Sequence, residues 1–321
     1  EEAASAKPQT NVPVAPKVMH VNGTVPAIDK AQIVDAYHLK VIKATIAKGG
    51  IQNMAFFGPA GSGKSTLAMQ IGALRGSPTW KIDSTSLQTA DEWFGSQTIK
   101  DGTLHTVLSD FVAALQTPNA TIVLDDVALL QNRTVQNGLN AVLDPSARTL
   151  NVPSLGLTVS VAEGVIIIGT WNVGDEYVAE RISAQIVDRF RSGCMFELQA
   201  LDDGAMEQMI IERTGLNKLA AHDLVLAQEW LKSDQSGTVS VEVTSRGLIA
   251  AAEGVIQGLT YGESFSSTVF CDLDDVSKGA AFVILQSKGK AEAKASAADK
   301  SRWEKQWATP KVGVSAVKIH V

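Results

Sequence analysis

The sequence is short of cysteine and has no long apolar run, and both shortages exclude classes of protein. Its two cysteines, Cys194 and Cys271, lie far apart and outside any metal-ligand spacing. Because disulfides are rare in cytosolic proteins, this usage indicates a reducing compartment and buried thiols. No apolar run reaches the roughly 18 residues that cross a membrane, and the first residues lack the pattern of a secretion signal. We therefore expect a soluble, cytoplasmic protein without a membrane partner.

Excess positive charge is also missing. The net charge is -6, the pI is near 5.4, and lysine and arginine are scattered along the chain. Nucleic-acid-binding domains usually carry a concentrated basic patch, so bulk binding of nucleic acid is not favoured, although the pore of a ring can be locally basic. The five histidines show no i, i+4 pair and no neighbouring cysteine, so no metal cluster is indicated.

The length of 321 residues and the high apolar content predict about two folded domains. Residues 1–27 are rich in Ala, Pro, Lys and Thr and are expected to form a flexible arm. We expect an α/β domain over 28–200 and a helical domain over 201–286. The lysine- and alanine-rich stretch that opens 287–321 predicts a tether and tail, whose Trp303 and Trp307 could dock on a neighbour or pack on their own domain.

Five short apolar runs are separated by longer amphipathic segments, which predicts buried strands joined by helical crossovers. The runs are NMAFFG at 53–58, TWKID at 79–83, ATIVLDD at 120–126, GVIIIGTWN at 164–172 and CMFELQ at 194–199. Such an alternation produces a five-stranded parallel sheet flanked by helices. Two extended runs around Pro153 interrupt it and predict a β-hairpin at 149–162. After Leu201, three amphipathic stripes predict the helical domain.

The strongest motif is GPAGSGKST, which fits the G-x-x-x-x-G-K-[ST] pattern of a phosphate-binding loop between a strand and a helix. Its glycines let backbone N–H groups converge on phosphate oxygens, and the following helix presents its positive N-terminus. Lys64 is expected to neutralise the β- and γ-phosphates, and Ser65, or alternatively Thr66, to bind magnesium. The expected nucleotide contacts are Gly58, Pro59, Ala60, Gly61, Ser62, Gly63, Lys64, Ser65 and Thr66.

Polar side chains follow two of the other predicted strands at their carboxyl ends. Asp125 and Asp126 end TIVLDD, and a parallel sheet places them beside the phosphate-binding loop. We predict that Asp125 coordinates magnesium and that Asp126 activates water, although a strand-end Asp can also cap a helix. Asn172 ends the following strand and could orient the attacking water, although an Asn in this place often begins a turn.

Taken in order, GPAGSGKST, IVLDDV, GTWN, IVDRF and VTSRGLIAAA resemble AAA+ ATPases, particularly the MoxR and CobS-like branch that includes chelatase motor subunits. The resemblance spans about residues 25–285. It implies a P-loop NTPase core with an all-α lid, ATP and magnesium as ligands, and a homo-oligomeric, hexameric ring that remodels or activates a protein partner as a chaperone does. Asn172 then corresponds to the first sensor, the hairpin to the insertion before it, and 89–111 to an insertion in the second helix.

Arginines complete the catalytic set that the resemblance implies. Arg181, Arg189 and Arg191 surround the start of the last predicted strand and could stabilise γ-phosphoryl charge, although surface ion pairs are their usual role. By resemblance, Arg189 of DRF is an arginine finger that reaches the neighbouring subunit's nucleotide, with Arg191 as the alternative. Arg246 of TSRG would be the second sensor in the lid.

The sequence departs from the family at Asp126, where a glutamate is usual. The missing methylene shortens the side chain by roughly 1.5 Å, and a catalytic base must come within about 2.6 to 3.2 Å of its proton. We therefore expect an ATPase whose hydrolysis could be slow, and an ATP-gated assembly scaffold is the first alternative. A nucleic-acid translocase is less favoured because the predicted hairpin carries only Arg148 at its base. A chelatase motor is the alternative from the family, and the sequence does not identify the client.

Overall fold

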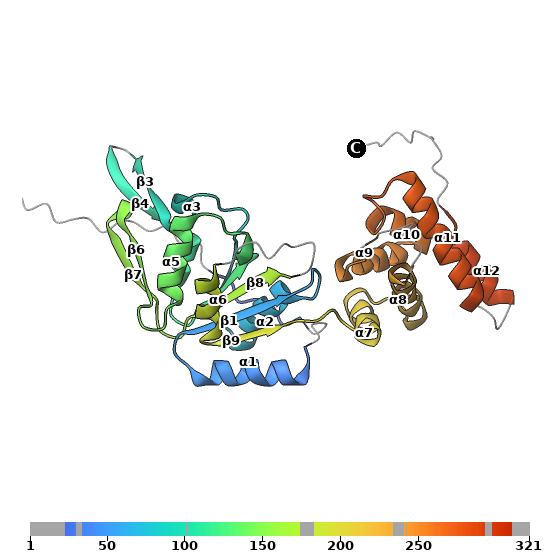
Figure 1. Cartoon of the computed structure of the whole chain (residues 1–321), viewed down its shortest axis with the longest axis horizontal. Helices are drawn as coiled ribbons and strands as arrows, with labels where there is room; N and C mark the ends of the chain where they lie inside the picture. Colours follow the sequence, from blue (N-terminus) through green and yellow to red (C-terminus); the bar gives the residue numbers. More distant parts are fainter. Residues whose placement is uncertain are drawn as a thin grey trace, which may run out of the picture. The chain divides into compact units, whose positions relative to one another are not determined.

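The structure of the chain is a computed structural model that describes residues 23–29, 34–100, 102–173, 183–233, 241, 243–292 and 297–309. The chain divides into two compact units, drawn in Figure 1. The first unit comprises Glu1–Ile28, Ala36–Phe57 and Ser65–Glu197, and the second comprises Asp29–Asp35, Gly58–Lys64 and Leu198–Val321. Most of the phosphate-binding loop therefore groups with the C-terminal helices, although it connects a strand and a helix of the first unit.

A five-stranded parallel sheet forms the centre of the first unit, as the sequence predicts, in the order β2-β5-β8-β1-β9. Its strands are β1 (Gln52–Gly58), β2 (Thr79–Asp83), β5 (Thr121–Asp125), β8 (Ile166–Asn172) and β9 (Cys194–Glu197). All five residues of β5 are buried, which explains why this strand appears in the sequence as a continuous apolar run. The parallel register of β2 and β5 places Asp83 opposite Asp125 at the carboxyl edge.

Helices of the first unit accompany the sheet. They are α1 (Ala36–Lys48), α2 (Lys64–Arg75), α4 (Asp110–Leu115), α5 (Arg133–Leu143) and α6 (Ala184–Arg191). Helix α4 packs on β2 and β5, while α1 and α6 pack on β9. Side-chain caps begin several of them: Ser109, Asn132 and Ser183 accept hydrogen bonds from backbone N–H groups of the first turn. Polar caps at the ends of apolar faces thus fix where each helix starts.

The chain before α1 is ordered earlier than the sequence predicts. We expected order to begin near Ile28, but Thr24 forms a bridge with Thr79, whose N–H donates to the Thr24 carbonyl at 2.9 Å. Gln70 also donates to the carbonyl of Ala27 at 3.1 Å. Because β2 lies at the edge of the sheet, its unpaired backbone groups can accept this extended segment. The rest of the predicted arm, residues 1–22, lies outside the described residues.

Two β-hairpins extend the first unit beyond the sheet. The hairpin expected at 149–162 consists of β6 (Thr149–Val152) and β7 (Leu157–Ser160), joined by the short helix η2 (Pro153–Leu155). The insertion at 89–111 contains α3 (Ala90–Phe94) followed by a second hairpin, β3 (Gly95–Lys100) and β4 (Thr103–Leu108). Strand β3 contacts η2, so the hairpins lie side by side (Figure 1).

The second unit contains more helices than the three amphipathic stripes indicated. They are α7 (Asp203–Thr214), α8 (Lys218–Lys232), α9 (Ser245–Ile256), α10 (Tyr261–Thr268), α11 (Asp275–Glu292) and α12 (Ala297–Gln306). Trp303 and Trp307 are buried in the core of this unit, so they pack on their own domain. Arg302 of α12 also forms an ion pair with buried Asp223 at 2.9 Å. The described end of the lysine- and alanine-rich stretch therefore belongs to a helix whose Trp303 packs in the core, where the sequence predicted a tether.

Two further expectations concern cysteines and membranes. Both cysteines are free, but Cys194 is buried while Cys271 is exposed, so the expectation of buried thiols is wrong for Cys271. In the part of the chain that the structure describes, none of the helices has the length and apolar character required to cross a membrane.

The burial of Trp307 predicts a large effect on stability. Trp307→Ala should lower the free energy of unfolding by about 3 to 5 kcal/mol, because the cavity would lie among Tyr261, Phe265 and Trp303. Urea denaturation followed by far-UV circular dichroism measures this change. Lys305→Ala removes an exposed side chain from α12, two residues before Trp307, and should change stability by less than about 0.5 kcal/mol. Equal stability of wild type and Trp307→Ala would contradict the packing.

Candidate functional site

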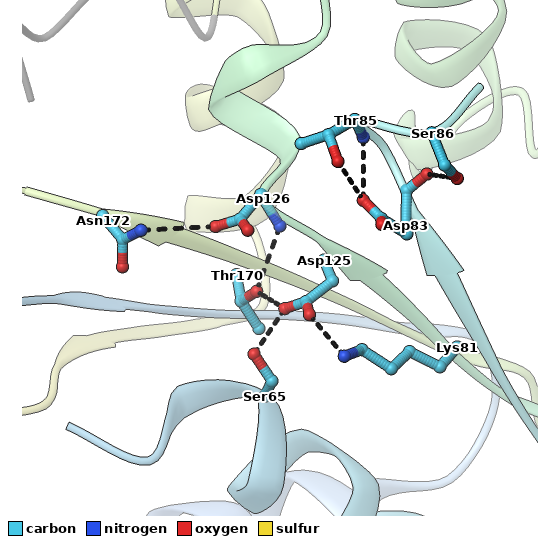
Figure 2. Close-up of polar contacts among 9 residues, drawn as sticks. All are labelled: Ser65, Lys81, Asp83, Thr85, Ser86, Asp125, Asp126, Thr170 and Asn172. Atoms are coloured by element: carbon cyan, nitrogen blue, oxygen red, sulfur yellow. Dashed lines mark hydrogen bonds and ion pairs between the residues drawn. The ribbon is translucent and has the colours of Figure 1, made fainter. Parts of the chain in front are cut away.

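The carboxylate of Asp125 is the centre of the polar site at the carboxyl edge of the sheet (Figure 2). It ends β5 and is 8% exposed. Its Oδ1 accepts hydrogen bonds from the hydroxyls of Ser65 and Thr170, each at 2.5 Å, and its Oδ2 lies 2.7 Å from the Lys81 ammonium. These donors come from α2, β8 and β2 respectively. Three elements distant in sequence thus converge on one buried charge.

The surroundings of Asp125 decide its protonation. Burial by itself raises the pKa of this carboxyl, because it penalises the charged form. Hydrogen bonds from Lys81, Ser65 and Thr170, together with the charge of Lys81, outweigh burial and leave the pKa below its ordinary value. Asp125 is therefore a carboxylate at neutral pH, which is the form that binds a metal ion.

Asp126 lies next to this carboxylate but points to a different partner. Its backbone is in the left-handed region, with φ of 52° and ψ of 43°, at the start of the short helix η1 (Val127–Leu129). Aspartate tolerates this region better than most residues. Its N–H donates to the Thr170 hydroxyl at 3.4 Å, and its Oδ1 accepts from the Asn172 amide at 3.5 Å. The structure thus brings together Asp126 and Asn172, as the sequence indicated, through a long and therefore weak hydrogen bond.

The residues of this edge fit a magnesium ion that arrives with a nucleotide. In the part of the chain described, no group of three or more His, Cys, Asp or Glu side chains could hold a metal alone. Magnesium, however, is usually held by one or two carboxylates together with substrate phosphates and water. Asp125 and Ser65 supply hard oxygen ligands of this kind beside the phosphate-binding loop. Thr66 is the next residue of α2 and stays the alternative hydroxyl.

The phosphate-binding loop itself belongs to the second unit, up to and including Lys64. The Lys64 ammonium donates to the carbonyls of Gly58 and Pro59, at 3.1 and 2.6 Å, and is 6% exposed. Gly61 has a positive φ of 73°, a conformation that favours glycine. A Cβ on Gly58 would lie within 2.1 Å of the Leu198 carbonyl oxygen. Gly58 is therefore required by chain packing as well as by any ligand.

The helical unit contacts the loop directly through the start of α9. The Ser245 hydroxyl donates to the carbonyl of Gly61 at 2.6 Å, and Thr244 caps the helix by accepting from the Gly247 N–H. Arg246 follows Ser245 in the first turn and is exposed. The predicted second-sensor residue is thus adjacent in sequence to a residue that contacts the loop.

The predicted finger, Arg189, lies in the last turn of α6 and forms an ion pair with Asp144 at 2.8 Å. Its side chain is 38% exposed. Arg191, the alternative, is exposed at the end of the same helix. Arg181 lies outside the described residues. Among the described residues of this chain, Arg189 and Arg191 are therefore not hydrogen-bond or ion-pair partners of Asp125.

Sequence reasoning missed the contacts of Lys81 and Ser245. Lys81 lies between buried Trp80 and Ile82 in β2, and a charged residue among buried apolar ones is a signal for a charged or polar partner. Ser245 gave no comparable signal, because a serine at a helix start usually acts as a cap. Its actual contact depends on tertiary placement.

Comparison with protein families matches residues 53–190 to the AAA domain, dynein-related subfamily. This range runs from β1 to α6 and includes the phosphate-binding loop, Asp125 and Asn172. Residues 53–190 are similar to this family and are called the AAA domain below. A search of curated protein sequences finds no significant match to the chain.

Solved structures similar to the chain include NtrX from Brucella abortus in complex with ADP and a variant of RuvB from Thermotoga maritima. NtrX is 18% identical with a TM-score of 0.46, and the match covers 69% of this chain but 50% of the NtrX chain. RuvB is 14% identical with a TM-score of 0.48, and the match covers 79% of this chain and 71% of RuvB. Similarity at this level assigns no activity or residue role to the AAA domain.

The contacts of Thr170 predict that it stabilises the AAA domain. Thr170→Val keeps the shape of the side chain but removes the donor to Asp125 and the acceptor of the Asp126 N–H. Because buried polar groups would lose partners, the free energy of unfolding should fall by about 1 to 3 kcal/mol, measured by urea denaturation. Thr158→Val, at an exposed position of β7, is the matched control. A Thr170→Val loss no larger than the control's would contradict the assignment.

Proposed function

We propose that the AAA domain binds ATP with magnesium and hydrolyses it to ADP and phosphate. The observation that carries this proposal is the hydrogen bond from Ser65, one residue after the loop lysine, to the buried carboxylate of Asp125. In P-loop NTPases a hydroxyl at this point of the motif and an acid at a neighbouring strand end hold the metal ion of the nucleotide. Here both side chains are in contact, and Asp125 is ionised.

Each of the remaining residues of the site would have its own role in cleavage of the γ-phosphate. Lys64, once it exchanges the loop carbonyls for phosphate oxygens, would neutralise β- and γ-phosphate charge. Asp126 and Asn172 would orient the attacking water from the edge of the sheet. A bound magnesium ion would supply further charge neutralisation on the phosphates. Catalysis would thus rest mainly on positioning and electrostatics.

Steady-state ATP turnover tests the proposal. Lys64→Ala should reduce turnover to background because it removes the charge that faces the phosphates. Asp126→Glu should increase turnover, because the longer side chain brings the carboxylate closer to water. Equal turnover by wild type and Lys64→Ala would remove the hydrolysis proposal. If wild type binds ATP and only Asp126→Glu hydrolyses it, the ATP-gated scaffold is the better description, which the long Asp126–Asn172 contact favours.

We also propose that the active form is a homo-oligomeric ring, hexameric as in the MoxR and CobS-like ATPases that the chain resembles. The arginines of α6 support a site shared between subunits, because the side chains of Arg189 and its partner Asp144 are both partly exposed. Exposed ion pairs contribute little to stability and can exchange partners. Arg246, beside the Ser245 contact with the loop, would report the nucleotide state to the helical lid.

A mixing experiment tests whether Arg189 acts in trans. Lys64→Ala and Arg189→Ala should each be inactive alone, since one lacks the loop lysine and the other lacks the finger. Mixed subunits should regain part of the ATP turnover, because some interfaces would combine an intact loop with an intact Arg189. Arg191→Ala is the matched control and should stay active alone. No recovery in mixtures whose co-assembly is verified by native mass spectrometry would refute the shared site.

The client is proposed to be a protein that the ring remodels or activates. On the β3–β4 hairpin, Ile99 is 74% exposed and Leu104 is 58% exposed, and exposed apolar groups often mark protein contacts. Residues 149–160 of the other hairpin contain neither lysine nor arginine. A nucleic-acid translocase is therefore disfavoured, because phosphate tracking depends on such charges.

A further inference from the structure

Strand β2 carries a lysine that the proposed reaction does not explain. Thr79, Trp80 and Ile82 are buried in this strand, whereas Lys81 and Asp83 are exposed. Side chains two residues apart on a strand share a face, and Asp83 pairs in register with Asp125. Lys81 thus lies on the face of the sheet that carries the Asp125 carboxylate, and its ammonium reaches Oδ2 of Asp125 at 2.7 Å (Figure 2).

The contacts of Asp125 differ in kind. The partners of Oδ1, Ser65 and Thr170, are neutral hydroxyls, which can stay in place while a metal ion binds the same carboxylate. The partner of Oδ2, Lys81, is a positive charge. A cation that approaches Asp125 is repelled by this ammonium and must share or replace it. The lysine therefore occupies a carboxylate oxygen that the proposed metal ion could otherwise bind.

The ion pair is not an ordinary surface pair. The Lys81 side chain is 47% exposed, but that of Asp125 is 12% exposed. An unpaired carboxylate at this depth is costly, whereas pairs between two exposed residues contribute little. The nearby carboxylate of Asp83 is already bound by the N–H and hydroxyl of Thr85, at 2.9 and 2.7 Å. Of these two carboxylates, Asp125 is therefore the one that forms the ion pair with Lys81.

We propose that Lys81 competes with the magnesium ion of the nucleotide for Asp125. The ammonium neutralises and orients the carboxylate before the nucleotide arrives, and it releases Oδ2 when the metal ion binds. A lysine suits this exchange because its charge sits on a flexible stem. Lys81 is a positioning residue, and the inference rests on the proposed binding of ATP with magnesium.

The test measures how binding of a fluorescent ATP analogue depends on magnesium concentration. Lys81→Met should lower the magnesium concentration at half-maximal binding by about 5- to 30-fold. Lys81→Gln, which also removes the charge but keeps a polar side chain, should shift this midpoint in the same direction. Lys81→Arg keeps the charge and should stay near wild type. Lys43→Met, which removes an exposed lysine of α1, should leave the midpoint unchanged.

A second measurement uses the nucleotide-free protein with magnesium chloride alone. Thermal unfolding in chelator should show Lys81→Met to be less stable than wild type, and added magnesium should raise its unfolding temperature more than that of wild type. A structural ion pair without competition would lower stability in chelator but leave both magnesium responses unchanged. The inference would be overturned if Lys81→Met and wild type had the same response to magnesium in thermal unfolding and the same magnesium midpoint in the nucleotide titration.

The two proposals fail in different ways. If wild type binds no ATP analogue at any magnesium concentration, the proposed function fails and this inference fails with it. If wild type and both charge-removing variants bind the analogue with the same magnesium midpoint, ATP binding stands and the role of Lys81 is wrong. Circular dichroism of each variant verifies that it is folded.

Discussion

The buried carboxylate of Asp125 constrains the carboxyl edge of the central sheet. A carboxylate at this depth must be paired, because an uncompensated buried charge is costly. Its donors come from α2, β2 and β8, so the first turn of α2 and both strands beside β5 must bring Ser65, Lys81 and Thr170 close to the end of β5. The parallel register of the sheet provides this alignment. A requirement of one side chain is thus satisfied by the topology of the whole sheet.

The phosphate-binding loop has a related double role. The chain passes from the second unit to the first between Lys64 and Ser65. On one side of this point, the Gly61 carbonyl accepts the Ser245 hydroxyl at the start of α9. On the other side, Ser65 donates to Asp125. Nearby residues of one motif thus take part in the packing of different units, Gly61 in the second and Ser65 in the first.

The sequence predicted the sheet well because buried parallel strands are apolar runs that end in turns or polar residues, as in TIVLDD. It also predicted which polar residues meet, since carboxyl ends of parallel strands share an edge. It failed for α12, because lysine- and alanine-rich composition indicates solvation, while the i, i+4 spacing of Trp303 and Trp307 was the better signal for a buried face. Lys81 gave a signal for a partner in the sequence, but the identity of that partner could not be predicted, because it depends on the register between β2 and β5.

The side chains of Asp125 and Asp126 make different contacts, and this difference affects the rate expected for the proposed hydrolysis of ATP. Asp125 has short contacts on both oxygens, and Asp126 accepts from Asn172 over a longer distance of 3.5 Å. The left-handed backbone of Asp126 fixes where its short side chain begins, so a shift of the chain cannot easily recover the missing length. A glutamate at this position would extend farther from the same backbone. If ATP and magnesium bind here as proposed, the missing length of the Asp126 side chain would slow hydrolysis more than it would weaken binding.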